Sequence, residues 1–538
     1  MVQPKTYDYI VVGAGSAGCV LAARLSENPG ARVLVLEAGG RAWMPLYHVP
    51  MMAGILFRIR YNNWAYLTEP EPHLDGRQIF WPRGKVLGGS HRINGTVYAR
   101  GHRLDYDTWR QMGNTGWGFD DILPYFKKSE DFQGPDWEHH GKGGPLTVTL
   151  GGGKDQLFDA LIESGRAAGF PVIDDLNAPE REGFGRHWFT TKNGRRWTTA
   201  QAFLEPAMGR PNLELRLKCT ISRVVVEHGR AVGVEYVKGG ERQVVYAERE
   251  IVLAGGAINS PTLLMHSGIG PANQLEPLGI HVVHDLPGVG ENLHDHPVVR
   301  MQFTGTPGSG MYDQLRWDRA MRNVVQTLLF GTGVGNAFPL QAGGYVKTRP
   351  ELAAPDIQCH FFPVMWNKLH GPGLKKSPLD RPGMISGFNI AVPESRGWLR
   401  LRSANPADPP RILCNYLATE GDRRTMRDGV KLMRNVMRQQ PIARFVERDY
   451  SPGPEVKTDA EIDAWVRAAT DTIFHPVGTC KMGIDPMAVV DPRLKVHGVD
   501  GLRVADASIM PVISASNTNA PTIMIAEKAA DMIKEDTA

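Results

Sequence analysis

The chain has 538 residues, of which 42% are hydrophobic and 22% charged, proportions close to those of average globular proteins, so wholesale disorder is excluded. The 61 basic residues against 57 acidic ones leave a formal charge of +4, which is too small to indicate a nucleic-acid-binding protein. At roughly 150 residues per domain, we expect three or four units, or fewer if two large domains interleave.

The cysteines and the apolar segments indicate the cellular compartment in which we expect the protein. None of the five cysteines has the spacing of a metal site or a disulfide framework, so we expect no bound metal and a reducing, cytoplasmic environment. The N-terminus lacks a basic segment followed by a long apolar one, and no run of about 18 apolar residues occurs. The sequence therefore predicts a soluble monomer or homodimer with neither a secretory signal nor a transmembrane segment.

The first predicted elements form a strand–turn–helix–strand unit. The apolar run Tyr9–Val12 predicts a buried strand, residues 19–25 have helical apolar spacing, and the run Val33–Leu36 predicts a second strand. The turn reads GAGSAG at residues 13–18, and Glu37 follows the second strand, 19 residues after the last glycine of the turn. This order is typical of a dinucleotide-binding fingerprint.

Each part of this fingerprint has a physical role. Gly13 makes the tight turn, Gly15 lets the backbone approach a pyrophosphate, and Gly18 lets the helix pack closely on the strand. The helix N-terminus offers unpaired N–H groups to phosphates, and Glu37 can accept hydrogen bonds from a ribose diol. We therefore predict a dinucleotide site that also includes Ser16, Ala17 and Ala38. Its position near the N-terminus favours FAD, although the motif alone does not exclude NAD.

Further motifs occur at residues 84–95, 256–270, 286–296, 475–483, 504–508 and 517–522. They read GKVLGGSHRING, GAINSPTLLMHSGIG, LPGVGENLHDH, HPVGTCKMG, VADAS and NTNAPT. In this order, and together with the N-terminal fingerprint, they resemble the glucose-methanol-choline (GMC) oxidoreductases, which are FAD-dependent alcohol oxidases and dehydrogenases. The resemblance covers nearly the whole chain and is strongest to the bacterial branch with choline dehydrogenase, sorbose dehydrogenase and hydroxymethylfurfural oxidase.

This resemblance implies an α/β protein in which an inserted α+β substrate domain, a sheet with flanking helices, interrupts a Rossmann-like FAD-binding domain. The FAD-binding domain would comprise residues 1–155, 199–300 and 468–538, and the substrate domain residues 156–198 and 301–467. The sequence pattern agrees in outline. Residues 424–437 have the spacing of an amphipathic outer helix, and strands are predicted at residues 213–217, 251–254, 357–362 and 398–401.

Oxidation of an alcohol requires a base for the hydroxyl proton while a hydride leaves the same carbon. His475 suits this role because histidine titrates near neutral pH and because the surrounding apolar residues make a polar ring costly to bury. It also occupies the position of the catalytic histidine in the family's H-P-x-G/A-T motif. The resemblance implies that Asn519 is its partner and donates to the forming alkoxide, whereas Asn517 is expected to be a turn residue. A purely structural role is the alternative for both His475 and Asn519.

The resemblance also implies flavin contacts by other segments of the chain. Ile221 corresponds to a position where the family binds adenine through the backbone. The ring, the pyrophosphate, the ribityl chain and the pyrimidine edge would be contacted by Gly88, Gly89, Asn94, Gly95, Thr96, Val97, Asp506, Ala507, Ala520, Pro521 and Thr522.

The residues that follow the paired glycines depart from the family pattern. The family has two small residues after Gly89, whereas here the second is His91, followed by Arg92. The sequence leaves open whether these side chains bond to the cofactor or point away from it. Some members of the family link FAD covalently to a histidine at the position that Ile93 occupies here. Isoleucine has no nucleophile, so we expect non-covalent FAD.

These observations predict an enzyme that oxidises a primary alcohol to the aldehyde by hydride transfer to flavin N5 and passes electrons to a quinone-like or dye acceptor. An oxidase that uses O2 shares the same motifs and stays an alternative. A lyase or a non-catalytic flavoprotein is less favoured, because neither needs the alcohol-oxidising pair. The substrate pocket is expected at an apolar cluster, which could equally be sheet core and would favour apolar alcohols over sugars: Phe361, Phe362, Val364, Met365 and Trp366.

Overall fold

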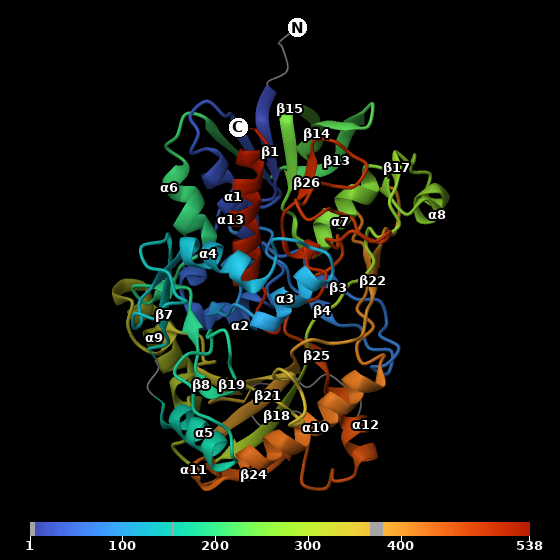
Figure 1. Ribbon diagram of the computed structural model, residues 1–538. Coiled ribbons are helices and arrows are strands. Elements are labelled where there is room, and N and C mark those ends of the chain that lie inside the picture. Colours follow the sequence, from blue (N-terminus) through green and yellow to red (C-terminus); the bar gives the residue numbers. More distant parts are fainter. Residues whose placement is uncertain (1–5, 153–154, 366–379, 538) are drawn as a thin grey trace.

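The computed structural model describes residues 6–152, 155–365 and 380–537 (Figure 1). In this part of the chain, the two largest sheets have seven strands each and lie one above the other in Figure 1, with both termini beside the upper sheet. The chain passes between the sheets several times, because each sheet takes strands from separate stretches of sequence. The predicted mixed α/β architecture is confirmed.

The upper sheet is built around β1 (Thr6–Val12), which is almost entirely buried. β1 runs parallel to β2 (Val33–Glu37) on one side and to β15 (Glu241–Leu253) on the other. A strand rich in Val and Ile is suited to this central position, where both of its faces are covered. The order is β12 (Leu213–Leu217), β2, β1, β15, β14 (Arg230–Lys238) and β13 (Thr220–Glu227), with β26 (Leu502–Val504) also paired to β15.

The turn after β1 requires glycine for steric reasons. Gly13 has a φ of +101°, and a Cβ atom there would lie 2.7 Å from the carbonyl oxygen of Ala254. A Cβ atom at Gly18 would lie 1.8 Å from the carbonyl oxygen of Gly13. These contacts let α1 (Ser16–Leu25) pack closely against the sheet, where it lies beside the C-terminal helix α13 (Asn519–Glu535) (Figure 1).

The lower sheet is antiparallel throughout. Four helices lie on its lower side in Figure 1: α5 (Gln156–Ala167), α10 (Glu420–Met437), α11 (Gln440–Ala443) and α12 (Asp459–Ala469). The strand order is β24 (Val446–Ser451), β18 (Pro297–Gly305), β21 (Gly383–Ile390), β20 (Ile357–Phe362), β19 (Ala342–Val346) and β8 (Gly183–Arg186), with β25 (Asp471–Thr472) also paired to β18.

Two predicted strands match the observed ones residue for residue, and other elements differ in extent. The strand predicted at residues 357–362 is β20, and the one at 213–217 is β12, whereas the one at 398–401 is β22 and ends at Arg400. Helix α10 begins at Glu420, earlier than predicted, because the Thr419 hydroxyl accepts a hydrogen bond from the N–H of Asp422 and caps the helix. The predicted boundary at residue 300 lies within β18, and β25 pairs with the lower sheet although it follows the boundary at 467.

Helix α9 (Trp317–Phe330) lies at the left edge of Figure 1. The remaining α-helices are shorter: α2 (Ala53–Leu56), α3 (Arg103–Gln111), α4 (Phe119–Ser129), α6 (Glu205–Ala207), α7 (Gly256–His266) and α8 (Ala272–Leu275). The remaining strands are β3 (Tyr66–Leu67), β4 (Phe80–Trp81), β5 (Val97–Tyr98), β6 (Glu130–Phe132), β7 (Leu146–Leu150), β9 (Trp188–Phe189), β10 (Thr191–Lys192), β11 (Arg195–Arg196), β16 (Ile269–Gly270), β17 (His284–Asp285), β22 (Trp398–Arg400) and β23 (Arg411–Leu413). Among the described residues, every helix is too short or too polar to cross a bilayer.

Candidate active site

A cavity of about 1330 Å³ is lined by residues of both large sheets. One end lies at the carboxyl ends of β1 and β2, where parallel sheets typically bind nucleotides. The other end is walled by residues from β18, β20 and the segment before α13. A cavity of this size can hold a dinucleotide together with a small substrate.

At the nucleotide end, two glycine backbones meet on the cavity wall. A Cβ atom on Gly89 would lie 2.7 Å from the Cα atom of Gly15, so the two segments touch without side chains between them. Gly15 precedes α1, and no side chain caps this helix. Its first N–H groups are therefore available to an anion, and the helix dipole favours one there.

Glu37 stands at the end of β2 on the same wall. Its carboxylate accepts hydrogen bonds from the N–H of Ala14 at 2.8 Å and from the N–H of Gly39 at 2.6 Å. These bonds fix the carboxylate beside the glycine turn, while burial raises its pKa. The arrangement fits the ribose of a dinucleotide, as the fingerprint predicts.

Most of the predicted cofactor residues line the cavity. These are Gly13, Gly15, Ser16, Ala17, Glu37, Ala38, Gly89, Asn94, Gly95, Thr96, Val97, Ile221, Asp506, Ala507 and Thr522. Four lie outside the lining residues, namely Gly18, Gly88, Ala520 and Pro521. Gly88 instead donates its N–H to the carbonyl of Ala14, so its contribution is to hold the two glycine segments together.

His475 lies on the wall at the opposite end, and His296 behind it fixes its protonation pattern. The Nε2 atom of His296 lies 2.9 Å from the carbonyl oxygen of Ala391, which can only accept, so this nitrogen carries the hydrogen. Burial lowers the pKa of His296 to about 3, so its ring is neutral and its Nδ1 is an acceptor. The Nδ1 atom of His475, 2.9 Å away, therefore donates to it. This leaves His475 Nε2 as the unprotonated nitrogen.

The unprotonated nitrogen of His475 faces an amide. Asn517 Nδ2 lies 3.1 Å from His475 Nε2 and donates to it. The orientation of this amide is set by Gln358, whose Nε2 atom donates to Asn517 Oδ1 at 3.2 Å. Both His475 and Asn517 line the cavity, so a base and a hydrogen-bond donor stand together at its wall.

This geometry corrects the predicted pairing of His475 with Asn519. Asn519 is the first residue of α13, and its Oδ1 atom accepts a hydrogen bond from the hydroxyl of Ser16 at 2.7 Å. That bond ties the N-terminus of α13 to that of α1, at the nucleotide end of the cavity. Asn517 lies two residues earlier, before the helix begins. Its backbone does not follow the helix, and its side chain reaches His475.

Asp295 holds the backbone of the segment that carries His475. Its Oδ1 atom accepts from the N–H of His475 at 2.7 Å, and its Oδ2 atom accepts from the hydroxyls of Thr472 and Tyr416. Sequence reasoning missed the roles of Asp295 and His296. The signal was present in the sequence His294-Asp295-His296, three polar residues in a row before a buried strand.

The electrostatic surroundings of His475 favour its neutral form. Burial lowers its pKa well below the ordinary value, and the neighbouring His296 and Arg83 lower it further. This corrects the expectation that His475 titrates near neutral pH. The unprotonated imidazole, which is the form that accepts a proton, is the dominant form at neutral pH.

Three of the five predicted pocket residues, Phe362, Val364 and Met365, line the cavity. Phe361 is fully buried on the other face of β20, where its ring lies 6.2 Å from that of Phe158. Successive side chains of a strand point to opposite faces, so Phe361 and Phe362 cannot both face the cavity. Phe361 is therefore core, which corrects its assignment, and Trp366 lies outside the described residues.

His91 and Arg92 point away from the cavity. His91 is buried, with its Nε2 atom 3.0 Å from the hydroxyl of Thr190 and its Nδ1 atom accepting from the N–H of Thr199. Arg92 donates to the carbonyl of Leu87 and to the side chain of Gln201. Neither residue lines the cavity, whereas Ile93 does.

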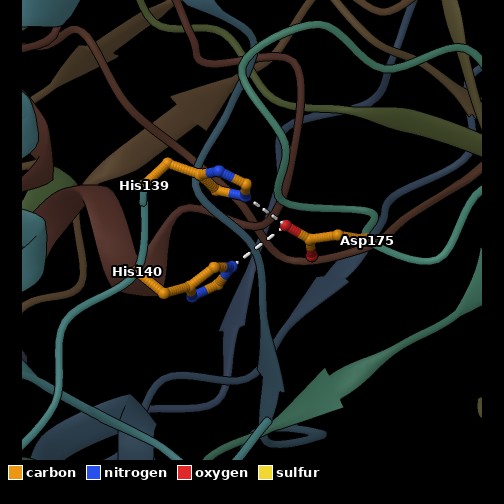
Figure 2. Close-up of side chains that lie close together, drawn as sticks. All are labelled: His139, His140 and Asp175. Atoms are coloured by element: carbon orange, nitrogen blue, oxygen red, sulfur yellow. Dashed lines mark hydrogen bonds and ion pairs between the residues drawn. The ribbon is translucent and has the colours of Figure 1, made fainter. Parts of the chain in front are cut away.

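A separate polar cluster consists of His139, His140 and Asp175 (Figure 2). The Oδ2 atom of Asp175 accepts hydrogen bonds from Nε2 of His139 at 2.6 Å and from Nε2 of His140 at 3.0 Å. The Nδ1 atom of His140 is also bonded to Glu130, which pairs with Arg100. Because these groups satisfy one another, we assign the cluster a structural role in joining the segments that carry them.

The fold and the cavity define a dinucleotide-dependent oxidoreductase with a histidine–asparagine pair. Comparison with known proteins identifies the class further. A family model described as GMC oxidoreductase matches residues 7–298, and a second GMC oxidoreductase model matches residues 393–526. The chain belongs to the GMC oxidoreductase family, and it is an FAD-dependent oxidoreductase that acts on CH–OH donors.

Individual relatives agree with this assignment over the full chain. An oxygen-dependent choline dehydrogenase of Pseudomonas fluorescens (strain SBW25) is 46% identical, covering 98% of this chain and 94% of the relative. The corresponding protein of Burkholderia cenocepacia (strain HI2424) is 45% identical over 99% and 94%. Among solved structures, pyridoxine 4-oxidase from Mesorbium loti has a TM-score of 0.88 at 32% identity, covering 98% of both chains.

Proposed function

We propose that this enzyme oxidises a primary alcohol with an uncharged, apolar or aromatic body to the aldehyde, with His475 as the base and Asn517 as the donor to the alcohol oxygen. The observation that carries the proposal is the chain of hydrogen bonds from Ala391 through His296 to His475, which leaves Nε2 of His475 unprotonated beside the Asn517 amide. An alcohol hydroxyl placed beside this pair would find one acceptor and, once the amide N–H turns towards it, one donor.

In this mechanism His475 Nε2 takes the hydroxyl proton. Its Nδ1–H stays bonded to His296, so the ring keeps its orientation while it becomes charged. The Asn517 Nδ2–H group shifts from His475 to the developing alkoxide and stabilises it. FAD, when bound, supplies the acceptor for the hydride that leaves the alcohol carbon. The glycine contact, the uncapped α1 and Glu37 are the groups of this chain that would hold it.

The charges of the cavity wall support an uncharged substrate. Of the carboxylates on the wall, Glu37 and Asp506 accept backbone hydrogen bonds at the nucleotide end. Asp471 forms an ion pair with Arg300 at 3.1 Å, and Asp408 accepts from the hydroxyl of Ser403. The wall near β20 carries His360 and is otherwise mainly apolar, with Phe338, Leu340, Phe362, Val364 and Met365. Such a wall favours an apolar body over a cation.

Choline is the second candidate substrate, because the relatives at 45–46% identity are named choline dehydrogenases. A quaternary ammonium group is recognised by an aromatic cage with a carboxylate nearby, and the paired state of Asp471 argues against that arrangement. Purified FAD-loaded protein should be assayed with benzyl alcohol, hexanol and choline. A higher kcat/KM for choline than for both uncharged alcohols would overturn the proposed substrate class while leaving the family assignment intact.

We further propose a quinone-like or dye acceptor, in line with the dehydrogenase names of the relatives, and a cytoplasmic location, in line with five buried free cysteines. O2 is the alternative acceptor, favoured by the oxygen-dependent names of these relatives and by the pyridoxine 4-oxidase structure. Dye reduction and oxygen consumption with the same alcohol would distinguish the two. Peroxide formation at a rate equal to dye reduction would favour the oxidase.

A further inference from the structure

Helix α9 exposes an apolar stripe at the edge of the molecule, level with the space between the two sheets (Figure 1). Trp317 is 81% exposed, Met321 64%, Val325 48% and Leu329 65%. These four residues recur every four positions, so they share one side of the helix. A surface helix of a globular protein normally turns such a stripe towards the core, whereas here it faces outwards.

The stripe borders the mouth of the active-site cavity. Trp317, Met321 and Val325 all belong to the cavity lining although they are largely exposed. Ile55 of α2, which is 52% exposed, lines the same cavity. Phe330, at the end of α9, is 72% exposed. We call these six residues, Ile55, Trp317, Met321, Val325, Leu329 and Phe330, the mouth patch.

The segments that carry the mouth patch are basic. Residues 41–61 contain Arg41, Arg58 and Arg60 and no acidic residue. Residues 312–330 contain Arg316, Arg319 and Arg322 against two aspartates. Most of these guanidinium groups are exposed. Together the two segments carry six arginines and two aspartates, a net charge of +4. This equals the net charge of the whole chain, so basic charge is concentrated around the patch.

We propose that the mouth patch is a docking surface for an anionic lipid bilayer, on which α9 lies in the interface with its apolar stripe inserted. An apolar face with tryptophan, flanked by arginines, is the composition of interfacial amphipathic helices. The arginines can reach the lipid phosphates while their alkyl chains stay among the apolar groups. Docking of this kind would open the cavity mouth onto the membrane, from which an apolar alcohol or a lipid-dissolved acceptor could enter.

A second copy of the chain is a less suitable occupant of the patch. A two-fold interface would place each surface against itself, so the arginines around one patch would face those around the other. Like charges brought together in this way oppose association. Anionic lipid, in contrast, supplies the opposite charge.

The experiment is flotation of the FAD-loaded full-length protein with vesicles of phosphatidylcholine alone or with phosphatidylglycerol. We expect binding to the mixed vesicles that weakens when the salt concentration is raised. The double variant Leu329→Glu, Phe330→Glu should bind at least about tenfold more weakly, because two apolar groups become anions at the interface. Both residues lie outside the cavity lining, so reduction of a soluble dye should persist.

A matched control replaces exposed apolar residues elsewhere. Ile484 is 71% exposed and Met487 42%, and the double variant Ile484→Glu, Met487→Glu should bind vesicles like the wild type. Arg322→Glu tests the charge separately, should the double variant fail to fold, with Arg242→Glu on β15 as its control. Wild-type protein that does not float with anionic vesicles would overturn the proposal. So would a concentration-dependent dimer in light scattering that the Leu329→Glu, Phe330→Glu variant converts to a monomer. Dye reduction measured in parallel tests the proposed function independently.

Discussion

The nucleotide end of the cavity is organised around one short stretch of chain, to which other segments add wall residues, whereas the end that holds His475 is assembled entirely from distant segments. Gly13, Gly15 and Glu37 lie within a single strand–helix–strand unit. His475 depends on His296, on the carbonyl of Ala391 and on Asn517. A site built from local sequence has its geometry fixed by the turn itself. A site built from distant segments depends on how the two sheets and α13 meet. A shift of two residues along the chain, from Asn519 to Asn517, therefore changes which side chain faces His475.

The sharpest test of the nucleotide end is Gly15→Val. A Cβ atom at Gly15 would lie 3.9 Å from Gly89 Cα, an ordinary contact, so the variant should fold. The valine side chain would nevertheless hold a pyrophosphate away from the backbone. We expect loss of bound FAD, measured by the flavin absorbance of the purified protein. Gly209→Val, at a glycine with open space around it, is the control and should stay yellow. A fully yellow Gly15→Val protein would contradict this account of the loop.

At the catalytic end the largest effect is expected for His475→Ala. Removal of a positioned base typically lowers kcat by about 10²–10⁴-fold, and FAD should remain bound because the glycine turn is untouched. Flavin reduction under anaerobic conditions measures the loss in a single turnover. His228→Ala, at an exposed histidine, should leave this rate unchanged. Near wild-type reduction by His475→Ala would remove the base assignment.

Asn517→Ala and Asn519→Ala distinguish the two ends directly. Asn517→Ala removes the hydrogen bond to the alcohol oxygen and should lower kcat by about 10²–10³-fold. Asn519→Ala removes the bond from Ser16 between two helix N-termini, so it should weaken retention of FAD more than it lowers kcat. Measuring both kcat and FAD content for each variant separates these effects. The reverse order of kcat losses would restore the pairing predicted from the sequence.

The pH dependence of flavin reduction should be shallow near neutrality. The pKa of His475 is lowered by burial and by His296 and Arg83, so the neutral, proton-accepting form persists well below the usual histidine range. As the pH falls through this lowered pKa, His475 becomes protonated and the rate declines; above it, the rate should be constant. Single-turnover rates from pH 4.5 to 9 would show the profile. A half-maximal rate at pH 7 or above would indicate a proton acceptor with a raised pKa.

The smallest effect is expected for His91→Ala. This substitution should not change how the flavin is attached, because we expect the flavin to be non-covalently bound. The His91 ring is bonded to Thr190 and Thr199 in the protein interior, and Ile93 stands on the wall without a nucleophile. Acid precipitation followed by centrifugation should leave the yellow colour in the supernatant for wild type and variant alike. Colour retained in the wild-type pellet would mean that another side chain bonds to the flavin.

The sequence predicted the elements whose residues interact over short distances. The fingerprint after β1 works because a strand, a tight turn and a helix follow one another within the chain. The strand at 357–362 was predicted correctly, yet the two phenylalanines at its end did not show which face meets the cavity. Phe361 and Phe362 are equally apolar, and only the position of the cavity relative to β20 separates core from pocket.

The sequence by itself determined the class of fold and the cofactor and singled out His475 as the proposed base, because glycine spacing, strand–helix order and a polar residue among apolar ones are local properties. The tertiary structure decided which asparagine meets His475. The Ser16–Asn519 bond holds Asn519 at the start of α13, so the residue before the helix is the one that faces His475. It also decided the protonation of His475, since His296, just before β18, bonds to His475 and is itself fixed by the carbonyl of Ala391, just after β21. Such hydrogen bonds and such burial depend on contacts between distant segments. The spacing of residues within one segment does not predict these contacts.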